Sequence, residues 1–106
     1  MAREKYRTLT EQMFYILLCL GRECCGVDIM EQVRSMTQGR VVIGPGTLYS
    51  LLESFRSEGF IRETQVDGRR RSYQITSTGR ELLKTEKERL FKQVEDYQRF
   101  YEEEPT

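Results

Sequence analysis

The side chains best suited to chemistry are a run of three arginines, Arg69–Arg71, and a group of hydroxyls around Tyr49. Guanidinium groups stay charged at physiological pH and bind phosphate oxygens through several N–H donors. Thr47 and Ser50 lie three residues apart, so on a helix their hydroxyl groups share a face that can reach base edges. These residue types indicate binding to nucleic acid rather than covalent catalysis.

A helix must present the hydroxyl groups, and the sequence predicts one that begins at Pro45 and ends before Gly59. Proline suits the first helical turn, and glycine suits the left-handed position that ends a helix. Four apolar residues recur at the spacing of one helix face: Leu48, Leu51, Leu52 and Phe55. Tyr49 lies about 100° from Leu48 on this helix. Helix geometry leaves two interpretations open for Tyr49: its hydroxyl contacts a DNA phosphate, which the family resemblance described below favours, or its ring packs on the neighbouring helix.

The arginines are predicted to belong to a β-hairpin. Two β-leaning runs, Phe60–Val66 and Arg69–Ile75, are joined by Asp67-Gly68, a pair that favours a two-residue turn. Side chains alternate along a strand, so at most two members of Arg69–Arg71 point the same way. We expect one or two of them on phosphates or in the minor groove. The alternative is a sheet edge protected by charge.

The remaining elements follow from caps and apolar spacing. The first seven residues are polar and are expected to be loosely ordered. Thr8 and Glu11 form a capping-box pattern. The elements that we expect before Pro45 are a helix from Thr8 to about Leu20, a helix from about Gly26 to Thr37, and a short extended segment over Val41–Ile43. The first helix is apolar on more than one face. This pattern indicates that the helix is packed on two sides, with a second subunit covering one of them.

A long helix is predicted from Thr76 or Thr78 to Tyr101, opened by a capping box of Thr78 and Glu81. Its apolar residues form a helical seam: Leu83, Leu90, Val94, Tyr97 and Tyr101. Such a helix extends beyond a domain of this size, so a symmetry-related copy is the simplest cover for the seam. We therefore predict that these five residues form a homodimer interface.

The order of elements predicts the fold class α+β, mainly α. Three helices followed by a hairpin make a winged helix-turn-helix, and the last element is a long C-terminal dimerisation helix. The predicted domains are a DNA-binding domain over residues 1–76 and the dimerisation helix over residues 77–106.

Composition excludes several other classes. The 106 residues carry 17 basic and 17 acidic side chains and no histidine, so no histidine is available as a general base. No nucleophile motif is present, which predicts that the chain is not an enzyme. Three cysteines make neither a disulfide framework nor a usual zinc set, and they suit a reducing cytoplasm. The longest apolar run, Met13–Leu20, is too short to span a membrane. We expect neither a metal nor a cofactor.

The chain resembles the PadR family of bacterial transcriptional repressors, in particular its short members with a single C-terminal helix. The residues that carry the resemblance are Gly44–Tyr49, Leu51-Leu52, Glu58–Ile61, Arg69–Thr76 and Thr78–Arg80. The resemblance covers most of residues 10–85. It implies a homodimer on a two-fold symmetric double-stranded DNA operator, with release controlled by a small-molecule effector or another signal.

Two positions depart from the family pattern. The chain has Ser50 where proline is common, and Gly26-Val27 where Gly-Tyr is common. A serine hydroxyl can donate a hydrogen bond that proline cannot, so the DNA contact there is expected to differ. Arg40, just before the recognition helix, is a weaker candidate for a phosphate contact. The alternative function is a winged-helix interaction module that docks a protein through its C-terminal helix without binding DNA.

Overall fold

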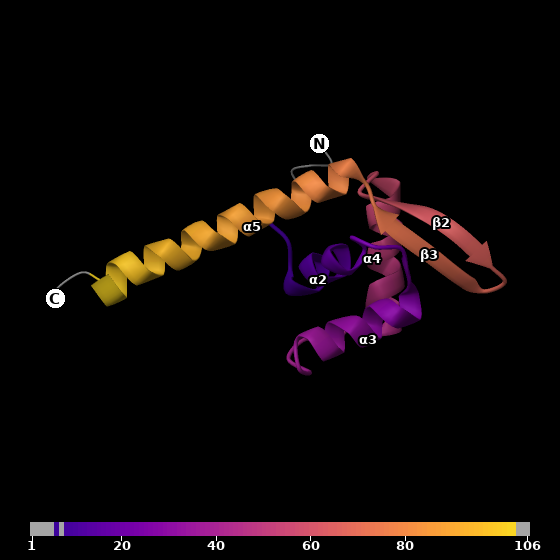
Figure 1. The fold of residues 1–106 in the computed structure, drawn as a ribbon, viewed down its shortest axis with the longest axis horizontal. Helices are drawn as coiled ribbons and strands as arrows, with labels where there is room; N and C mark the ends of the chain where they lie inside the picture. Colours follow the sequence, from indigo (N-terminus) through magenta and orange to yellow (C-terminus); the bar gives the residue numbers. More distant parts are fainter. Residues whose placement is uncertain (1–5, 7, 104–106) are drawn as a thin grey trace.

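A computed structural model describes residue 6 and residues 8–103 of the chain (Figure 1). Its elements, in chain order, are α2 (Glu11–Cys19), β1 (Cys24–Cys25), α3 (Gly26–Met36), α4 (Pro45–Ser57), β2 (Ile61–Asp67), β3 (Arg70–Ile75), α5 (Ser77–Tyr97) and the π-helix η1 (Gln98–Glu103). The order helix, helix, helix, hairpin and long helix agrees with the sequence prediction. Strand β1 was not predicted, and the segment Val41–Ile43, expected to be extended, belongs to no strand of the sheet.

The three strands form one antiparallel sheet in the order β1-β3-β2. Asp67 pairs with Arg70, so the two turn residues are Gly68 and Arg69 rather than the predicted Asp67-Gly68. Only Gly68 has a positive φ, +63°, which is the pattern of a type II′ turn with glycine at its first central position. A bulge at Thr64 adds a residue to β2 and breaks the regular register.

The core lies where α2, α3 and α4 meet one face of the sheet. Its fully buried side chains are Ile16, Leu17, Leu20, Ile29, Val33, Leu48, Leu52, Phe55 and Ile61. The apolar stripe predicted for the recognition helix is confirmed, because Leu48, Leu52 and Phe55 face this core, with Leu51 packed at its edge. Gly59 adopts the predicted left-handed conformation, with φ +81°.

The start of the chain departs from the prediction. Tyr6 was expected in a loosely ordered segment but is buried, with its ring centroid 5.1 Å from that of Phe60 and 6.1 Å from that of Phe55. Burial of an aromatic ring is strongly favourable, which accounts for the position of Tyr6 against the core. The rest of the predicted loose segment, residues 1–5 and 7, lies outside the described residues.

Both predicted helix caps are displaced by two residues. The Thr10 hydroxyl, not that of Thr8, accepts from the Met13 N–H at the start of α2. At the start of α5 the Thr76 hydroxyl accepts from the Gly79 N–H, so Thr76 rather than Thr78 is the cap. The sequence offers two threonines at the start of each helix, Thr8 and Thr10 for α2 and Thr76 and Thr78 for α5. Tertiary packing determines which of the two caps the helix.

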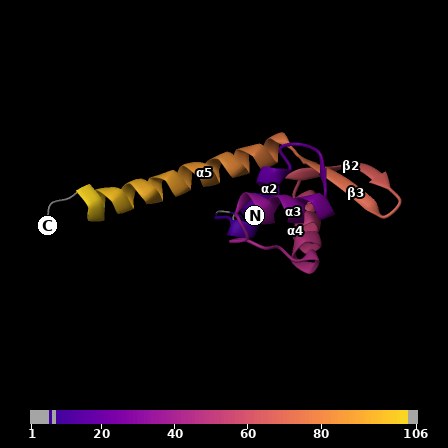
Figure 2. The same cartoon turned by 60° about the horizontal axis from the view of Figure 1, so that its bottom comes forward.

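Helix α5 is held by the domain only along its first half. Gly79 lies against the Phe60 carbonyl, and Glu86 is buried, where its carboxylate accepts from Arg89 at 2.9 Å. The Arg89 hydrogen bond and the backbone of Leu9 both lower the pKa of the Glu86 carboxyl. The second half of α5 and η1 project away from the domain in both views (Figures 1 and 2). None of the described helices has the length and apolarity needed to cross a membrane.

Gly79→Ala is expected to destabilise the protein, although alanine is normally the better helix former. A Cβ at this position would lie 2.1 Å from the carbonyl oxygen of Phe60, a backbone atom that cannot rotate away. We expect a loss of roughly 1–3 kcal/mol in the free energy of unfolding, measured by urea denaturation. Gly46→Ala is the control, since nothing lies within 4 Å of its Cβ position. Equal stability of the two variants would contradict the contact.

Candidate nucleic-acid interface

The outer face of α4 carries the hydroxyl residues singled out in the sequence. Thr47, Tyr49 and Ser50 are exposed, whereas Leu48 and Leu52 on the other side of the helix are buried. Thr47 and Ser50 lie in the first two turns of α4, close to its N-terminus. Side chains in this part of a recognition helix are the ones that contact base edges in helix-turn-helix complexes.

The ring of Tyr49 lies across the first residue of α3. A Cβ placed on Gly26 would come within 2.6 Å of the Tyr49 hydroxyl oxygen and 2.9 Å of Cε1. Only glycine therefore allows the ring to lie here. Tyr49 is nevertheless 46% exposed. Part of the ring therefore covers the neighbouring helix, which is one of the two interpretations made from the sequence, and the contact of its hydroxyl with a phosphate stays a prediction.

Tyr49 and the three arginines line one cavity of about 460 Å³, where the beginning of α3, helix α4 and the hairpin converge. The residues that line it are Cys25, Gly26, Val27, Tyr49, Arg69, Arg70, Arg71 and Tyr73. The side chain of Cys25, the N-cap of α3, accepts no capping hydrogen bond from the backbone N–H groups of the first turn, and its thiol donates to the Asp28 carboxylate at 3.3 Å. A helix N-terminus attracts negative charge, and the arginines add to that attraction. The cavity therefore suits an anionic group.

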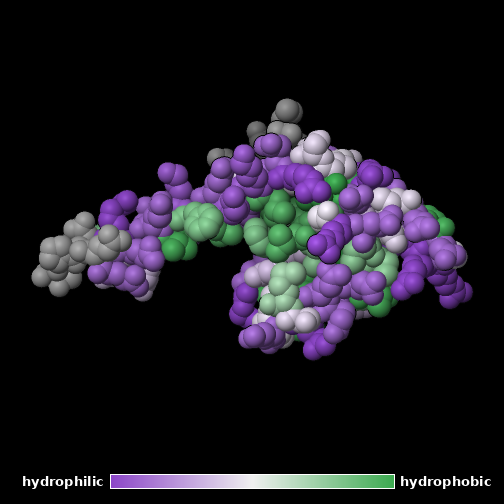
Figure 3. All heavy atoms as spheres, in the orientation of Figure 1, coloured by the Kyte–Doolittle hydropathy of each residue, from purple (hydrophilic) through white to green (hydrophobic). Residues whose placement is uncertain are grey.

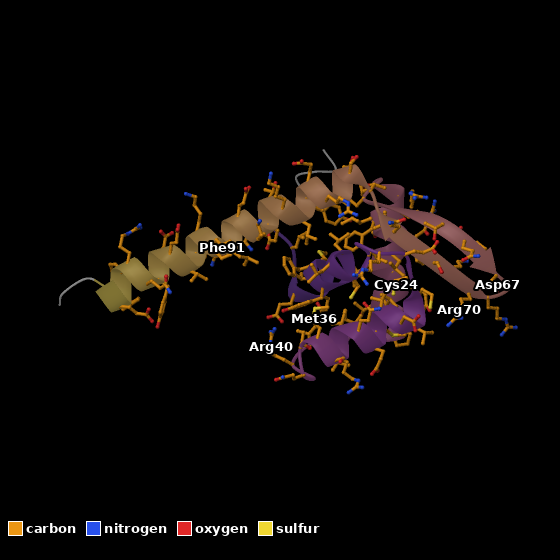
Figure 4. All side chains as sticks on the ribbon, in the orientation of Figure 1. Cys24, Met36, Arg40, Asp67, Arg70 and Phe91 are labelled. Atoms are coloured by element: carbon orange, nitrogen blue, oxygen red, sulfur yellow. The ribbon has the colours of Figure 1, made fainter. Side chains whose placement is uncertain are left out.

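The three arginines differ in how they are held. Arg71 makes an ion pair of 3.2 Å with Glu63 on the adjacent strand. No hydrogen bond or ion pair to another described residue engages the side chain of Arg69 or Arg70. Arg70 extends from the hairpin near its tip, with Asp67 beside it (Figure 4). Of the three arginines that line the cavity, Arg69 and Arg70 can therefore bind an anion without breaking an ion pair to a described residue.

Arg40 does not join this cavity. Its guanidinium makes an ion pair of 3.1 Å with Glu11 and donates to the Tyr15 hydroxyl at 2.9 Å. Figure 4 places Arg40 near the far end of α3, away from the hairpin. The observed contacts tie the loop before α4 to α2.

An acidic side chain, Glu53, also lies on the exposed face of α4, one turn beyond Tyr49 and Ser50. Arg56 donates to it at 2.6 Å, and this hydrogen bond is the main reason that the pKa of the Glu53 carboxyl is lowered. Glu53 is therefore an ionised acceptor at neutral pH. The nearby phenol of Tyr73 has a raised pKa, mainly because of burial and then because of Glu63.

The cysteines are buried thiols. Burial, followed by the charge of Asp28, raises the pKa of Cys24 to about 11, and burial raises the pKa of Cys19. Both thiols stay protonated at neutral pH, and a protonated thiol is a poor nucleophile and metal ligand. Cys19 packs in the hydrophobic core. Over the described part of the chain, no three His, Cys, Asp or Glu side chains gather in a way that could hold a metal ion.

Sequence reasoning missed the contribution of α3 to the site. Val27 is 62% exposed and lines the cavity beside Tyr49, although the sequence analysis gave it no role in the site. The signal available was Gly26 at the start of a helix, a position where glycine is not needed for the backbone. The residues around Gly26 in the sequence do not indicate that the Tyr49 ring from α4 occupies the space where a side chain at position 26 would lie.

Comparison with known proteins agrees with this architecture. The family model described as "Transcriptional regulator PadR-like family" matches residues 16–85, more than half of the chain. A transcriptional regulator from Clostridium thermocellum superposes with a TM-score of 0.72 at 23% identity, over 87% of this chain and 93% of that one. A PadR family transcription regulator from Clostridium difficile superposes with a TM-score of 0.66 at 23% identity, over 83% of this chain and 96% of that one.

RosR from H. salinarum superposes with a TM-score of 0.62 at 20% identity, over 89% of this chain and 79% of that one. No curated protein matches the chain. At such identities the solved structures show likeness of fold. They confirm the predicted fold class, a mainly helical α+β winged helix with a long C-terminal helix.

The contact between Gly26 and Tyr49 can be tested by a double-mutant cycle. Gly26→Ala should destabilise the protein that retains Tyr49, because the new Cβ displaces the ring. In a Tyr49→Ala background the same change should be neutral or stabilising, since alanine favours helix. We expect a coupling energy of roughly 0.5–3 kcal/mol from urea denaturation of the four proteins. An equal cost of Gly26→Ala in both backgrounds would show that the ring does not occupy this space.

Proposed function

This chain belongs to the PadR-like family of transcriptional regulators, and we propose that it acts as a repressor that binds a two-fold symmetric DNA operator as a homodimer. The observation that carries the proposal is the cavity shared by the start of α3, Tyr49 and Arg69–Arg71. Three separate elements direct hydrogen-bond donors or positive charge at one place. A DNA phosphate is the anion that fits such a site at the edge of a recognition helix.

In this arrangement the cavity positions the protein and α4 reads the sequence. The Tyr49 hydroxyl, the first N–H groups of α3 and the hairpin arginines hold the sugar-phosphate backbone. Thr47 and Ser50 then lie at the major groove, where their hydroxyl groups contact base edges. Ser50 contributes a donor where a proline would offer none. Arg40 makes a weaker phosphate contact, for which it would leave Glu11 and Tyr15.

The homodimer is supported by the second half of α5. The apolar side chains of the seam beyond Leu83 are exposed in the single chain, with Leu90 39%, Val94 52% and Tyr97 58% accessible. Soluble proteins rarely leave a continuous apolar face of this kind uncovered. Two copies joined through α5 would carry two recognition helices, which read half-sites about one DNA turn, roughly 34 Å, apart.

Release of the protein from DNA in response to a signal follows from the same dimer arrangement. The spacing of the two recognition helices depends on how the two copies of α5 pack together. A small-molecule effector or another signal that alters this packing would change the spacing and weaken binding to an operator of fixed geometry.

Replacing Arg69, Arg70 and Arg71 with alanine should weaken binding to every duplex by a similar factor, because phosphate contacts carry no sequence information. The slope of log K against log salt should become shallower by about one to two units. Fluorescence anisotropy over a salt series measures both. As a matched control, replacing Arg22, Arg34 and Arg99 with alanine removes the same charge elsewhere. Wild-type protein with no salt-dependent duplex binding would favour the interaction-module alternative.

Leu90→Asp combined with Val94→Asp should give a monomer that has lost most of its operator affinity. The double variant places four carboxylates in the interface of a two-fold dimer, and burying unpaired charge there is strongly unfavourable. Sedimentation at micromolar concentration reports the association state. Lys92→Asp is the control, because Lys92 lies on the opposite side of α5 from the seam. A double variant that remains dimeric would place the contact on another surface.

A further inference from the structure

The exposed face of α4 carries an acidic side chain beside the residues proposed to contact DNA. Glu53 lies three residues after Ser50 and four after Tyr49, so the three exposed side chains follow one another along the same side of the helix. A carboxylate that approaches DNA is repelled by the phosphates unless neighbouring cations compensate its charge. The position of Glu53 therefore depends on which cations surround it.

Two arginines provide this compensation. Arg56, one turn further along α4, binds both carboxylate oxygens of Glu53: its Nη2 donates to Oε1 at 2.6 Å and its Nε donates to Oε2 at 3.3 Å. After Arg56, the charge of Arg71 on β3 also lowers the pKa of the Glu53 carboxyl. Arg71 lines the cavity proposed for a phosphate. The carboxylate is therefore ionised, compensated and close to that cavity.

The pair with Arg56 also restricts the conformation of the Glu53 side chain. Holding a flexible side chain in one rotamer costs conformational entropy, and two hydrogen bonds to one guanidinium reduce the freedom that is left to lose. An ionised carboxylate has about four lone-pair sites and no donor, so Arg56 leaves acceptor capacity free. The Glu53 side chain is still 67% exposed. It therefore presents a fixed, accessible hydrogen-bond acceptor.

The surroundings of Glu53 are those of a DNA-binding surface. Helix α4 packs against β2 at the hairpin end of the molecule. This end, at the right of Figure 3, is covered mainly by hydrophilic side chains, whereas hydrophobic ones gather beside α5. Interfaces with DNA are more polar and more basic than interfaces between proteins. A base edge is therefore a better match for this acceptor than a protein surface.

The major groove offers a group that only accepts hydrogen bonds two kinds of partner. Cytosine presents its N4 amino group and adenine its N6 amino group, whereas guanine and thymine present acceptors and no donor. Adenine also presents the N7 acceptor next to N6, and N7 repels a carboxylate. A fixed carboxylate in the groove therefore favours cytosine.

We propose that Glu53 is a specificity-determining residue that accepts a hydrogen bond from N4 of one cytosine in each operator half-site, and that Arg56 is the residue that positions it. The inference rests on the proposed DNA binding and adds a base to the operator. The cavity beside Tyr49 sets the register of the protein on the phosphates. Glu53 then contacts a base one helical turn beyond the phosphate contact.

Selection from random duplexes, followed by affinity measurements on the selected operator, tests the assignment. Wild-type protein should select a C·G pair at one position of each half-site and bind the other three pairs there roughly 5–150-fold more weakly. Glu53→Ala should remove this preference and leave the other positions unchanged. Glu53→Gln should move the preference to adenine, because an amide pairs with both N6 and N7 of that base.

Replacing the selected cytosine with N4-methylcytosine tests the contact at a single atom. The methyl group takes the place of the N–H that points into the major groove, while pairing with guanine is kept. Wild-type affinity should fall by about fivefold or more, which is the lower end of the loss expected for a wrong base. The Glu53→Ala variant should bind the methylated and unmethylated duplexes equally.

Arg56→Ala should reduce the discrimination between cytosine and the other bases without changing which base is preferred, and Arg56→Lys should restore part of it. A residue needed only for stability would not give this pattern. Glu81→Gln is the matched control, because it removes the same charge from an exposed residue of α5. It should leave every base preference unchanged.

Two results separate failure of this inference from failure of the proposed function. If Glu53→Gln raises the affinity for all duplexes by one factor and leaves the selected sequence unchanged, Glu53 only repels phosphates and the assignment is overturned. A wild-type protein that selects no cytosine whose preference depends on Glu53 overturns it as well, and the proposed DNA binding stands in both cases. A wild-type protein without salt-dependent duplex binding overturns the proposed function and the inference together.

Discussion

The apolar stripe of α4 is the constraint on which the candidate interface depends. Burial of Leu48, Leu52 and Phe55 contributes roughly 1.5–3 kcal/mol each, so together they match the whole stability of a small domain. A rotation of α4 by one residue would expose these side chains. The free energy lost on their exposure is larger than the stabilisation that a surface hydrogen bond could provide. The helix is therefore locked with Thr47, Tyr49 and Ser50 outward, and no interaction among those residues is needed to hold them there.

Once α4 is locked, the rest of the interface follows from two close approaches. Gly26 lets the Tyr49 ring lie on α3, which brings the N-terminus of that helix beside the recognition helix. The turn at Gly68 returns β3 so that the hairpin arginines border the same cavity. The site contains few direct bonds between its charged groups. Its positive character comes from a helix end and from the guanidinium groups of Arg69 and Arg70, which make no ion pair with any described residue and can therefore bind an anion.

Local patterns predicted the elements well, and they failed where a choice depended on distant residues. The α4 stripe and its terminal glycine were predictable because spacing and backbone preference are properties of a short segment. The hairpin turn was placed one residue early, since Asp67-Gly68 and Gly68-Arg69 both satisfy turn chemistry and only strand pairing chooses between them. Arg40 carries no local sign that it pairs with Glu11, twenty-nine residues away. Of the candidate site, the residue types were predictable, whereas the contribution of α3 required the fold.

In the proposed homodimer, the long helix links the association of two copies to the recognition of DNA. Its first half is stabilised by the contacts of Gly79 and Glu86 with the domain, whereas an isolated helical segment as short as the second half is only marginally stable in water. Whatever covers the exposed seam therefore also determines whether this half stays helical. If a second copy supplies that cover, folding of the distal helix and spacing of the two recognition helices become one coupled equilibrium. A signal then needs to act on only one of the two to alter DNA binding.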